Sequence, residues 1–116
     1  MACTGNYVVV FVTFGSRAEA EKLACAVVSK KLASSGQVSG PVSNTYRWHG
    51  KMESAQEWLC TLKTTKAAYP KLEAAIRSLY SSEVPQIVAV PMVAGSGPYL
   101  SWIGSGAITD ARMKKR

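Results

Sequence analysis

The residue in this sequence best suited to bind a transition metal is its single histidine. His49 lies in the run Tyr46-Arg47-Trp48-His49-Gly50-Lys51, beside two aromatic and two basic residues. Imidazole is a good ligand for copper and related divalent ions, but one imidazole alone does not make a multidentate site. A metal site built on His49 therefore needs other donors, or histidines from symmetry-related subunits. A solvated histidine at a turn is the simpler alternative.

No catalytic arrangement can be assembled from the remaining residues. A Ser-His-Asp triad would need His49 together with Asp110, the sole aspartate, which lies close to a basic run at the C-terminal end. Gly95-Ser96-Gly97 lacks the rest of a dinucleotide-binding fingerprint and is better explained as a turn. Carboxylates are few and scattered, so their spacing identifies no general acid–base pair. We expect a protein that is not an enzyme.

The composition is that of one globular domain of 116 residues, 47% of them hydrophobic. The net charge is +7, and Arg112, Lys114, Lys115 and Arg116 supply four of the positive charges. We expect this run to be a solvated tail and assign it no function. The cysteines are odd in number and lack C-x-x-C spacing, which favours reduced thiols; they are Cys3, Cys25 and Cys60. No segment is long enough to span a membrane, and we expect a cytoplasmic protein.

The histidine run also carries the strongest turn signal in the middle of the chain. His49-Gly50 is the one strong break between Val38 and Thr64. Two strands of about eleven residues, each about 35 Å long, are predicted to pair across it. Hairpin arms of that length exceed what a small domain can cover. The second arm has its core-facing positions at Trp58, Cys60 and Leu62.

Helices and strands alternate around this hairpin. Tyr7–Thr13 and Ile87–Val93 are predicted strands, and Pro91 favours a sheet edge for the second. The first helix is predicted to begin at the capping pair Ser16 and Glu19 and to run to about Ser34, with Gly36 as its left-handed cap. A second helix has Pro70 in its first turn and an apolar stripe at Leu72, Ala75, Ile76 and Leu79.

A short third helix is predicted after Gly95-Ser96-Gly97-Pro98, giving the order β-α-β-β-α-β-α. This order predicts an α+β fold, a ferredoxin-like βαββαβ sandwich with an extra C-terminal helix. Helices would cover one face of an antiparallel four-stranded sheet. The other apolar face and the long hairpin both favour association with further subunits.

Six segments of the sequence resemble the CutA divalent-cation tolerance proteins, and the Tyr46–Lys51 block is the most specific of them. The resemblance covers residues 7–103, with 1–6 as an N-terminal extension and 104–116 as a basic C-terminal tail. The other segments are Tyr7-Val8-Val9-Val10-Phe11-Val12-Thr13, Lys31-Leu32-Ala33, Leu62-Lys63-Thr64-Thr65, Val84-Pro85-Gln86-Ile87-Val88-Ala89-Val90-Pro91 and Tyr99-Leu100-Ser101-Trp102-Ile103.

The resemblance implies a homotrimer, related in architecture to the PII signalling proteins and linked to tolerance of copper and other divalent ions. It implies no catalytic reaction and no required cofactor. By position, the family's inter-subunit cleft would be lined by Tyr46, Arg47, Trp48, Glu57, Lys63 and Trp102. An ion pair between Glu57 and Lys63 is one expectation for this cleft.

Three positions depart from the family pattern where metal ligands are common. Ser35, Tyr80 and Gln86 replace cysteine, histidine and glutamate with a hydroxyl, a phenol and an amide, which are weaker donors. We therefore expect Cu(II) or another divalent cation to bind weakly, with His49 as the best remaining ligand.

Two other functions remain open from the residues. A PII-like module would bind an anionic small molecule or a partner protein in the cleft, through Lys63 and Arg47. A nucleic-acid binder on a ferredoxin-like sheet is favoured by the isoelectric point near 9.5. Because the aromatic motif of RNA-recognition domains is missing, we expect no nucleic acid as partner.

Overall fold

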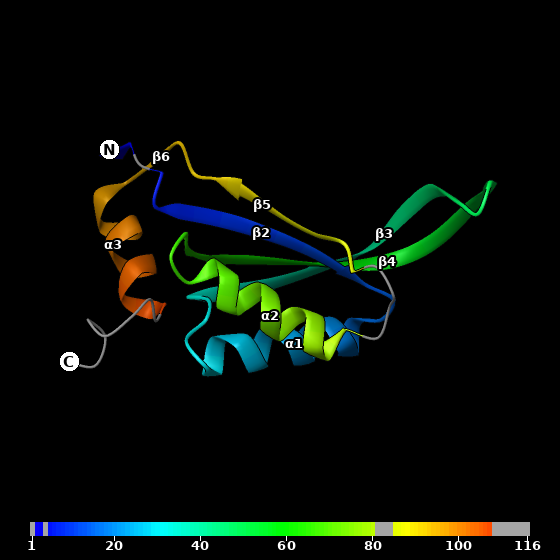
Figure 1. Cartoon of the computed structure of the whole chain (residues 1–116), viewed down its shortest axis with the longest axis horizontal. Coiled ribbons are helices and arrows are strands. Elements are labelled where there is room, and N and C mark those ends of the chain that lie inside the picture. Colours follow the sequence, from blue (N-terminus) through cyan, green and yellow to red (C-terminus); the bar gives the residue numbers. More distant parts are fainter. Residues whose placement is uncertain (1, 4, 81–84, 108–116) are drawn as a thin grey trace.

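A four-stranded antiparallel sheet with helices packed on one side forms the body of the molecule (Figure 1). The computed structural model describes residues 2–3, 5–80 and 85–107. The basic run Arg112–Arg116, Asp110 and the predicted helix breaker at Glu83-Val84 lie outside these residues. In spatial order the strands are β3 (Ser35–Trp48), β4 (Lys51–Thr65), β2 (Tyr7–Phe14) and β5 (Ile87–Pro91).

Helices α1 (Arg17–Ser29) and α2 (Tyr69–Leu79) lie side by side beneath the sheet, and α3 (Gly97–Gly106) lies beyond one end of it (Figure 1). A separate ladder pairs β1 (Ala2–Cys3) with β6 (Ala94–Gly95). The predicted ferredoxin-like α+β fold with a third helix is thus confirmed, and β5 is the edge strand that Pro91 indicated.

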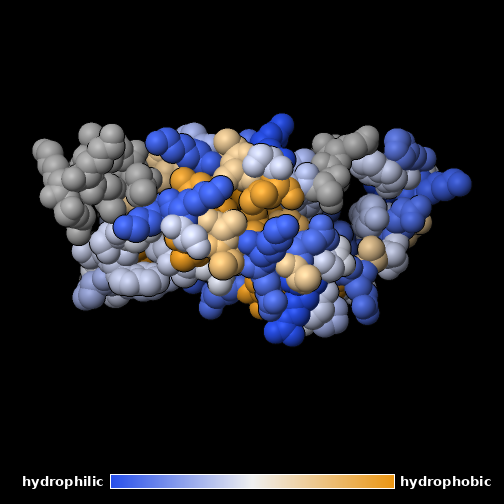
Figure 2. All heavy atoms as spheres, turned by 90° about the horizontal axis from the view of Figure 1, so that it is seen from below, coloured by the Kyte–Doolittle hydropathy of each residue, from blue (hydrophilic) through white to orange (hydrophobic). Residues whose placement is uncertain are grey.

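The core lies between the sheet and the two helices, and strand alternation determines which residues enter it. In β2, every second residue from Val8 to Phe14 is buried, while Val9, Phe11 and Thr13 lie on the opposite face. The outer surface of the helical layer is largely hydrophilic, with hydrophobic residues gathered near its middle (Figure 2). None of the described helices is long and apolar enough to cross a membrane.

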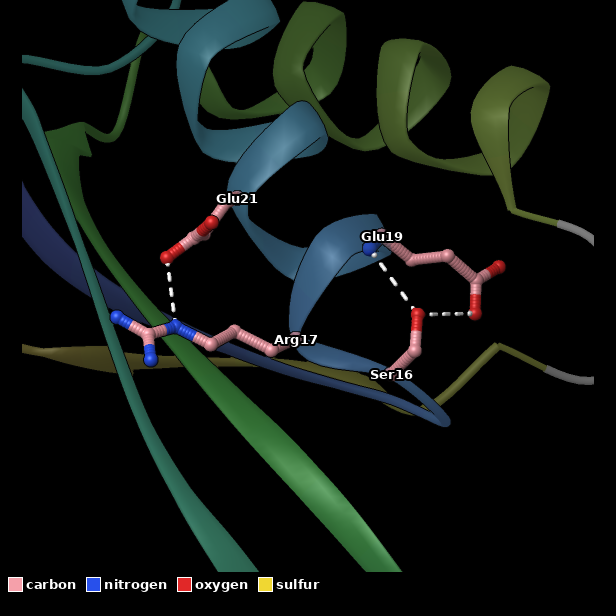
Figure 3. A network of polar contacts seen from close by, with 4 residues as sticks. All are labelled: Ser16, Arg17, Glu19 and Glu21. Carbon is pink, nitrogen blue, oxygen red and sulfur yellow. Dashed lines mark hydrogen bonds and ion pairs between the residues drawn. The ribbon is translucent and has the colours of Figure 1, made fainter.

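Helix α1 begins where the sequence predicted. The Ser16 hydroxyl accepts a hydrogen bond from the Glu19 backbone N–H at 3.2 Å and bonds the Glu19 carboxylate at 3.2 Å (Figure 3). The next residue, Arg17, donates from its guanidinium to Glu21, four residues further along the helix, at 2.8 Å. An N-cap of this kind satisfies one of the free N–H groups of the first turn.

The end of α1 differs from the prediction, because the helix stops at Ser29 and not near Ser34. Lys31 takes the left-handed conformation with φ 59°. The N–H of Lys31 donates to the Val28 carbonyl at 3.0 Å, and that of Leu32 to the Val27 carbonyl at 2.9 Å. These bonds form a Schellman motif, a tight helix ending usually built on glycine. The local pattern concealed it because lysine occupies the glycine position.

Gly36 is consequently not a helix cap but part of β3. A Cβ atom at this position would lie 2.9 Å from the Ala24 Cβ and 3.0 Å from the Leu62 Cδ2. Glycine is needed here because α1 approaches the strand closely.

The hairpin is longer than predicted, with strands of 14 and 15 residues. A register shift between Ser39 and Val42 interrupts the β3–β4 ladder, and the Gly40-Pro41 peptide within it is cis. The predicted turn is confirmed: His49 and Gly50 both have positive φ, 51° and 79°, as a type I′ turn requires. The arm projects well beyond the helices (Figure 1).

The packed part of the chain continues past residue 103, where the sequence placed the start of the tail. Helix α3 extends to Gly106, and Ala107 is buried. The Ser34 hydroxyl donates to the Ile103 carbonyl, which joins α3 to the segment that follows α1.

Candidate functional site

The β3–β4 register places four of the predicted cleft residues on one face of the hairpin. Tyr46 pairs with Glu53, and Val42 pairs with Glu57. Since side chains alternate along a strand, Tyr46, Trp48, Glu57 and Lys63 point to the same side. This side is the open face of the sheet, because Lys63 pairs with Val9. Arg47 points to the other side.

These four residues nevertheless do not meet within one protomer. Trp48 pairs with Lys51 at the hairpin tip, whereas Lys63 lies twelve residues further along β4. At about 3.3 Å per residue this separation is roughly 40 Å. Glu57 is six residues from Lys63, or roughly 20 Å along the strand, too far for an ion pair. A cleft that contains both ends of this row must be formed by different protomers.

Glu57 has a different partner from the one expected. Both of its carboxylate oxygens accept from the Asn44 side-chain amide at 3.2 Å, across the two hairpin strands. Glu57 and Lys63 therefore form no ion pair within the described protomer, and an ion pair between subunits stays a prediction.

At the hairpin tip, the His49 ring meets the Trp48 ring edge to face, with centroids 4.7 Å apart and an angle of 75° between the rings. His49 is exposed, and Tyr46 and Trp48 are 37% and 45% exposed. Exposed aromatic residues on a projecting arm are typical of an association surface.

A second cluster lies where β4 meets α3, and we call it the α3 cluster: Gln37, Lys63, Tyr99 and Trp102. The Lys63 Nζ lies 5.8 Å from the centroid of the Tyr99 ring and 3.5 Å from the Gln37 Oε1. Tyr99 stacks on Trp102 at 5.8 Å with 19° between the rings, and Trp102 is 49% exposed. The structure thus brings together Lys63 and Trp102, two of the predicted residues.

Tyr99 is the member of the α3 cluster that the sequence did not predict as a site residue. Its separation of three residues from Trp102 on a predicted helix was the available signal, because residues three apart share a helix face. The Lys63 ammonium, above the Tyr99 ring, has no carboxylate partner among the ion pairs of the described chain.

The three departures from the family pattern do not form one site. Ser35 pairs with Lys63 near one end of the sheet. Tyr80 lies at the other end, where its hydroxyl donates to the Thr13 carbonyl and its ring packs on Phe14 at 4.8 Å. Burial is the main cause that raises the pKa of Tyr80, which keeps the phenol neutral and makes it a poor metal ligand. The exposed Gln86 contributes a backbone hydrogen bond to Tyr80.

Metal donors are dispersed in the protomer. Within residues 5–80 and 85–107, no three His, Cys, Asp or Glu side chains are grouped closely enough to hold an ion. Cys60 is buried, and burial raises the pKa of its thiol from 9.0 to about 11, which disfavours the thiolate that metals bind. A cavity of about 130 Å³ beside α1 includes Phe14, Leu23 and Leu79 in its lining but none of the predicted site residues.

Comparisons with known proteins agree with this geometry. Residues 8–106 match the family model described as "CutA1 divalent ion tolerance protein". "Divalent-cation tolerance protein CutA" of Thermus thermophilus is 37% identical over 95 residues, which cover 82% of this chain and 92% of that protein. Human "Protein CutA" is 34% identical over 99 residues, 85% of this chain. The match spans only about half of the human relative's length, 55%.

Solved structures show the same arrangement. The divalent cation tolerance protein from Thermus thermophilus superposes with a TM-score of 0.86 at 34% identity, covering 88% of this chain and 99% of that one. CutA1 from Oryza sativa gives 0.88 at 26% identity, covering 94% and 100%. With the family model matched over most of the chain and the fold shared throughout, this protein belongs to the CutA1 divalent ion tolerance family.

Proposed function

We propose that the protein is a cytoplasmic, non-catalytic homotrimer that contributes to tolerance of copper by binding Cu(II) weakly between subunits. The observation that carries this proposal is the open face of the sheet. Val88 and Val90 of the edge strand β5 are 55% and 44% exposed, and they pair with Phe11 and Val9 of β2. Leu59 of β4 lies on the same face. Such a face needs a cover, and copies of the chain supply one.

A site between subunits also explains how scattered donors can serve a metal. The protomer offers one imidazole at the tip of an arm, and cyclic symmetry would supply further copies of it and of its neighbours. Carboxylate and imidazole donors from different subunits then complete a coordination shell. The free cysteines Cys25 and Cys60 support a reducing, cytoplasmic compartment.

Light scattering tests the assembly. We expect a mass about three times the 12.4 kDa of one protomer at micromolar concentration, because the apolar open face and the exposed aromatics of the hairpin favour burial between subunits. A monomer under these conditions would disprove the trimer and the cleft with it.

Calorimetric titration with Cu(II) tests the metal site. We expect micromolar or poorer affinity, about 8 kcal/mol of binding free energy or less, and loss of most of it in His49→Ala. Lys51→Ala, two residues along the same turn, is the matched control and should bind like the wild type. Nanomolar binding that survives His49→Ala would show that the ligands lie elsewhere.

The α3 cluster supports a second candidate, a PII-like module that binds an anionic small molecule in the same cleft. Lys63 forms no ion pair with another described residue, and its ammonium lies over Tyr99, which stacks on Trp102; these two rings would accept a planar group. Arg47 of a neighbouring subunit would be the second cation. Titration with nucleotides separates the candidates: binding that Lys63→Gln abolishes and His49→Ala preserves favours the anion.

A further inference from the structure

Four lysines gather at one end of the part of the molecule that the structure describes. Helices α1 and α2 run in opposite directions, so the last residues of α1 and the first of α2 lie at the same end (Figure 1). Lys30 and Lys31 directly follow the last residue of α1, and Lys66 and Lys71 flank the start of α2. We call these four residues the basic end. The Thr64 hydroxyl donates to the Leu32 carbonyl at 2.7 Å, which joins the two lysine pairs.

The lysines of the basic end are exposed, and none of them forms an ion pair with another described residue. The ion pairs among the described residues are Arg17 with Glu21 and Arg77 with Glu73, and neither includes one of these lysines. Glu73 on α2 is held by Arg77 at 3.8 Å. The α2 N-terminus adds partial positive charge, since its first turn contains no acidic residue and no side-chain cap.

Helix α3 ends close to the segment that follows Lys31. A Cβ atom on Gly106 would lie 2.9 Å from the Ser34 hydroxyl, three residues beyond Lys31. In the sequence, Arg112 follows Ala107 by five residues. Outside the basic end and the segment after Ala107, six basic residues are balanced by six acidic ones. The whole net charge of +7 therefore belongs to these two groups.

We propose that the basic end is a docking surface for an anionic lipid membrane. Clusters of four to eight basic residues are attracted to the negative surface of such membranes. The basic end consists of lysines, which act as point charges and lack the planar guanidinium fork. Single-stranded nucleic acid is bound by aromatic stacking as well as charge, and the exposed aromatics Tyr99 and Trp102 lie with Lys63 instead.

Three-fold symmetry further favours a membrane over nucleic acid as the partner. This preference rests on the trimer proposed above. In a cyclic trimer, the three copies of any surface lie at one height along the axis. Three basic ends at one height match a flat membrane better than a single nucleic-acid strand, and simultaneous contact multiplies their affinities.

Vesicle co-sedimentation of the full chain tests the proposal, with phosphatidylcholine vesicles that contain or lack phosphatidylserine. We expect binding at low salt that requires phosphatidylserine. The triple variant Lys30→Gln, Lys66→Gln, Lys71→Gln should lower the partition coefficient by at least about 100-fold, since each lysine near an anionic surface contributes roughly fivefold.

The matched control removes the same charge elsewhere: Lys22→Gln, Lys51→Gln, Arg77→Gln. It should lower the partition coefficient clearly less than the basic-end variant does, because these exposed charges lie farther from the membrane-facing end along α1, α2 and the hairpin. Arginine at positions 30, 66 and 71 should preserve binding, and circular dichroism melts should show that all variants fold. Equal losses in both triple variants would overturn the proposal, because net charge alone would then explain binding.

Two further outcomes would also overturn it. One is absence of binding to phosphatidylserine vesicles at low salt. The other is tight binding of polyuridine RNA together with no vesicle binding, which would assign the basic end to nucleic acid. Light scattering on the same samples reports the trimer separately, so failure of the membrane proposal and failure of the assembly are distinguishable.

Discussion

At the scale of single residues, Cys60 shows how burial converts a reactive group into a structural one. Its thiol pKa rises from 9.0 to about 11 because burial disfavours the thiolate. A folded-state pKa above the unfolded value stabilises the protein below pH 9, and this stabilisation is lost as pH rises through about 11. We expect the urea midpoint of the wild type to fall over this range more steeply than that of Cys60→Ala.

The control for this prediction is Cys25→Ala, because Cys25 is exposed on α1. Its pH profile should follow the wild type. Parallel profiles for the wild type and Cys60→Ala would show that the buried thiol does not contribute to the alkaline loss of stability.

At the scale of the elements, the contact between α1 and β3 depends on Gly36. Its missing side chain lets Ala24 and Leu62 approach to 2.9 and 3.0 Å of where a Cβ atom would lie. Gly36→Ala should destabilise the fold by about 1 to 3 kcal/mol through overpacking, measured by urea unfolding. Gly97→Ala is the matched control, because nothing lies within 4 Å of its added atom. Equal effects of the two substitutions would contradict the close-approach explanation.

At the scale of the whole molecule, the hairpin is an arm without a partner in its own protomer. Trp48 is 45% exposed there, so Trp48→Ala should leave the protomer fold intact but weaken the trimer by about 3 to 5 kcal/mol through loss of an aromatic anchor. The measurement is the concentration at which the trimer dissociates, followed by light scattering on dilution. Thr45→Ala, on the opposite face of the same strand, should dissociate like the wild type. An unchanged dissociation for Trp48→Ala would show that the arm does not anchor the assembly.

The sequence by itself determined the features that depend only on residues close together along the chain. The Ser16–Glu19 cap, the His49-Gly50 turn and the alternation of β2 each depend on neighbours along the chain, so the element order and the fold class followed from them. The family resemblance then pointed to Lys63 and Trp102 as residues of a common site, and the structure brings these two together through Tyr99.

Only the tertiary structure decided the features that depend on contacts between distant segments. Helix α1 ends at Ser29 in a lysine-based Schellman motif, and Gly36 is glycine because Ala24 and Leu62 press on it. Likewise, Tyr80 has a structural role, because its hydroxyl donates a hydrogen bond to the carbonyl of Thr13, 67 residues away in sequence. Such contacts arise when the helices pack on the sheet, and no local pattern encodes which side chains then meet. The basic end has the same origin, because antiparallel packing of α1 and α2 places their lysines at one end of the molecule.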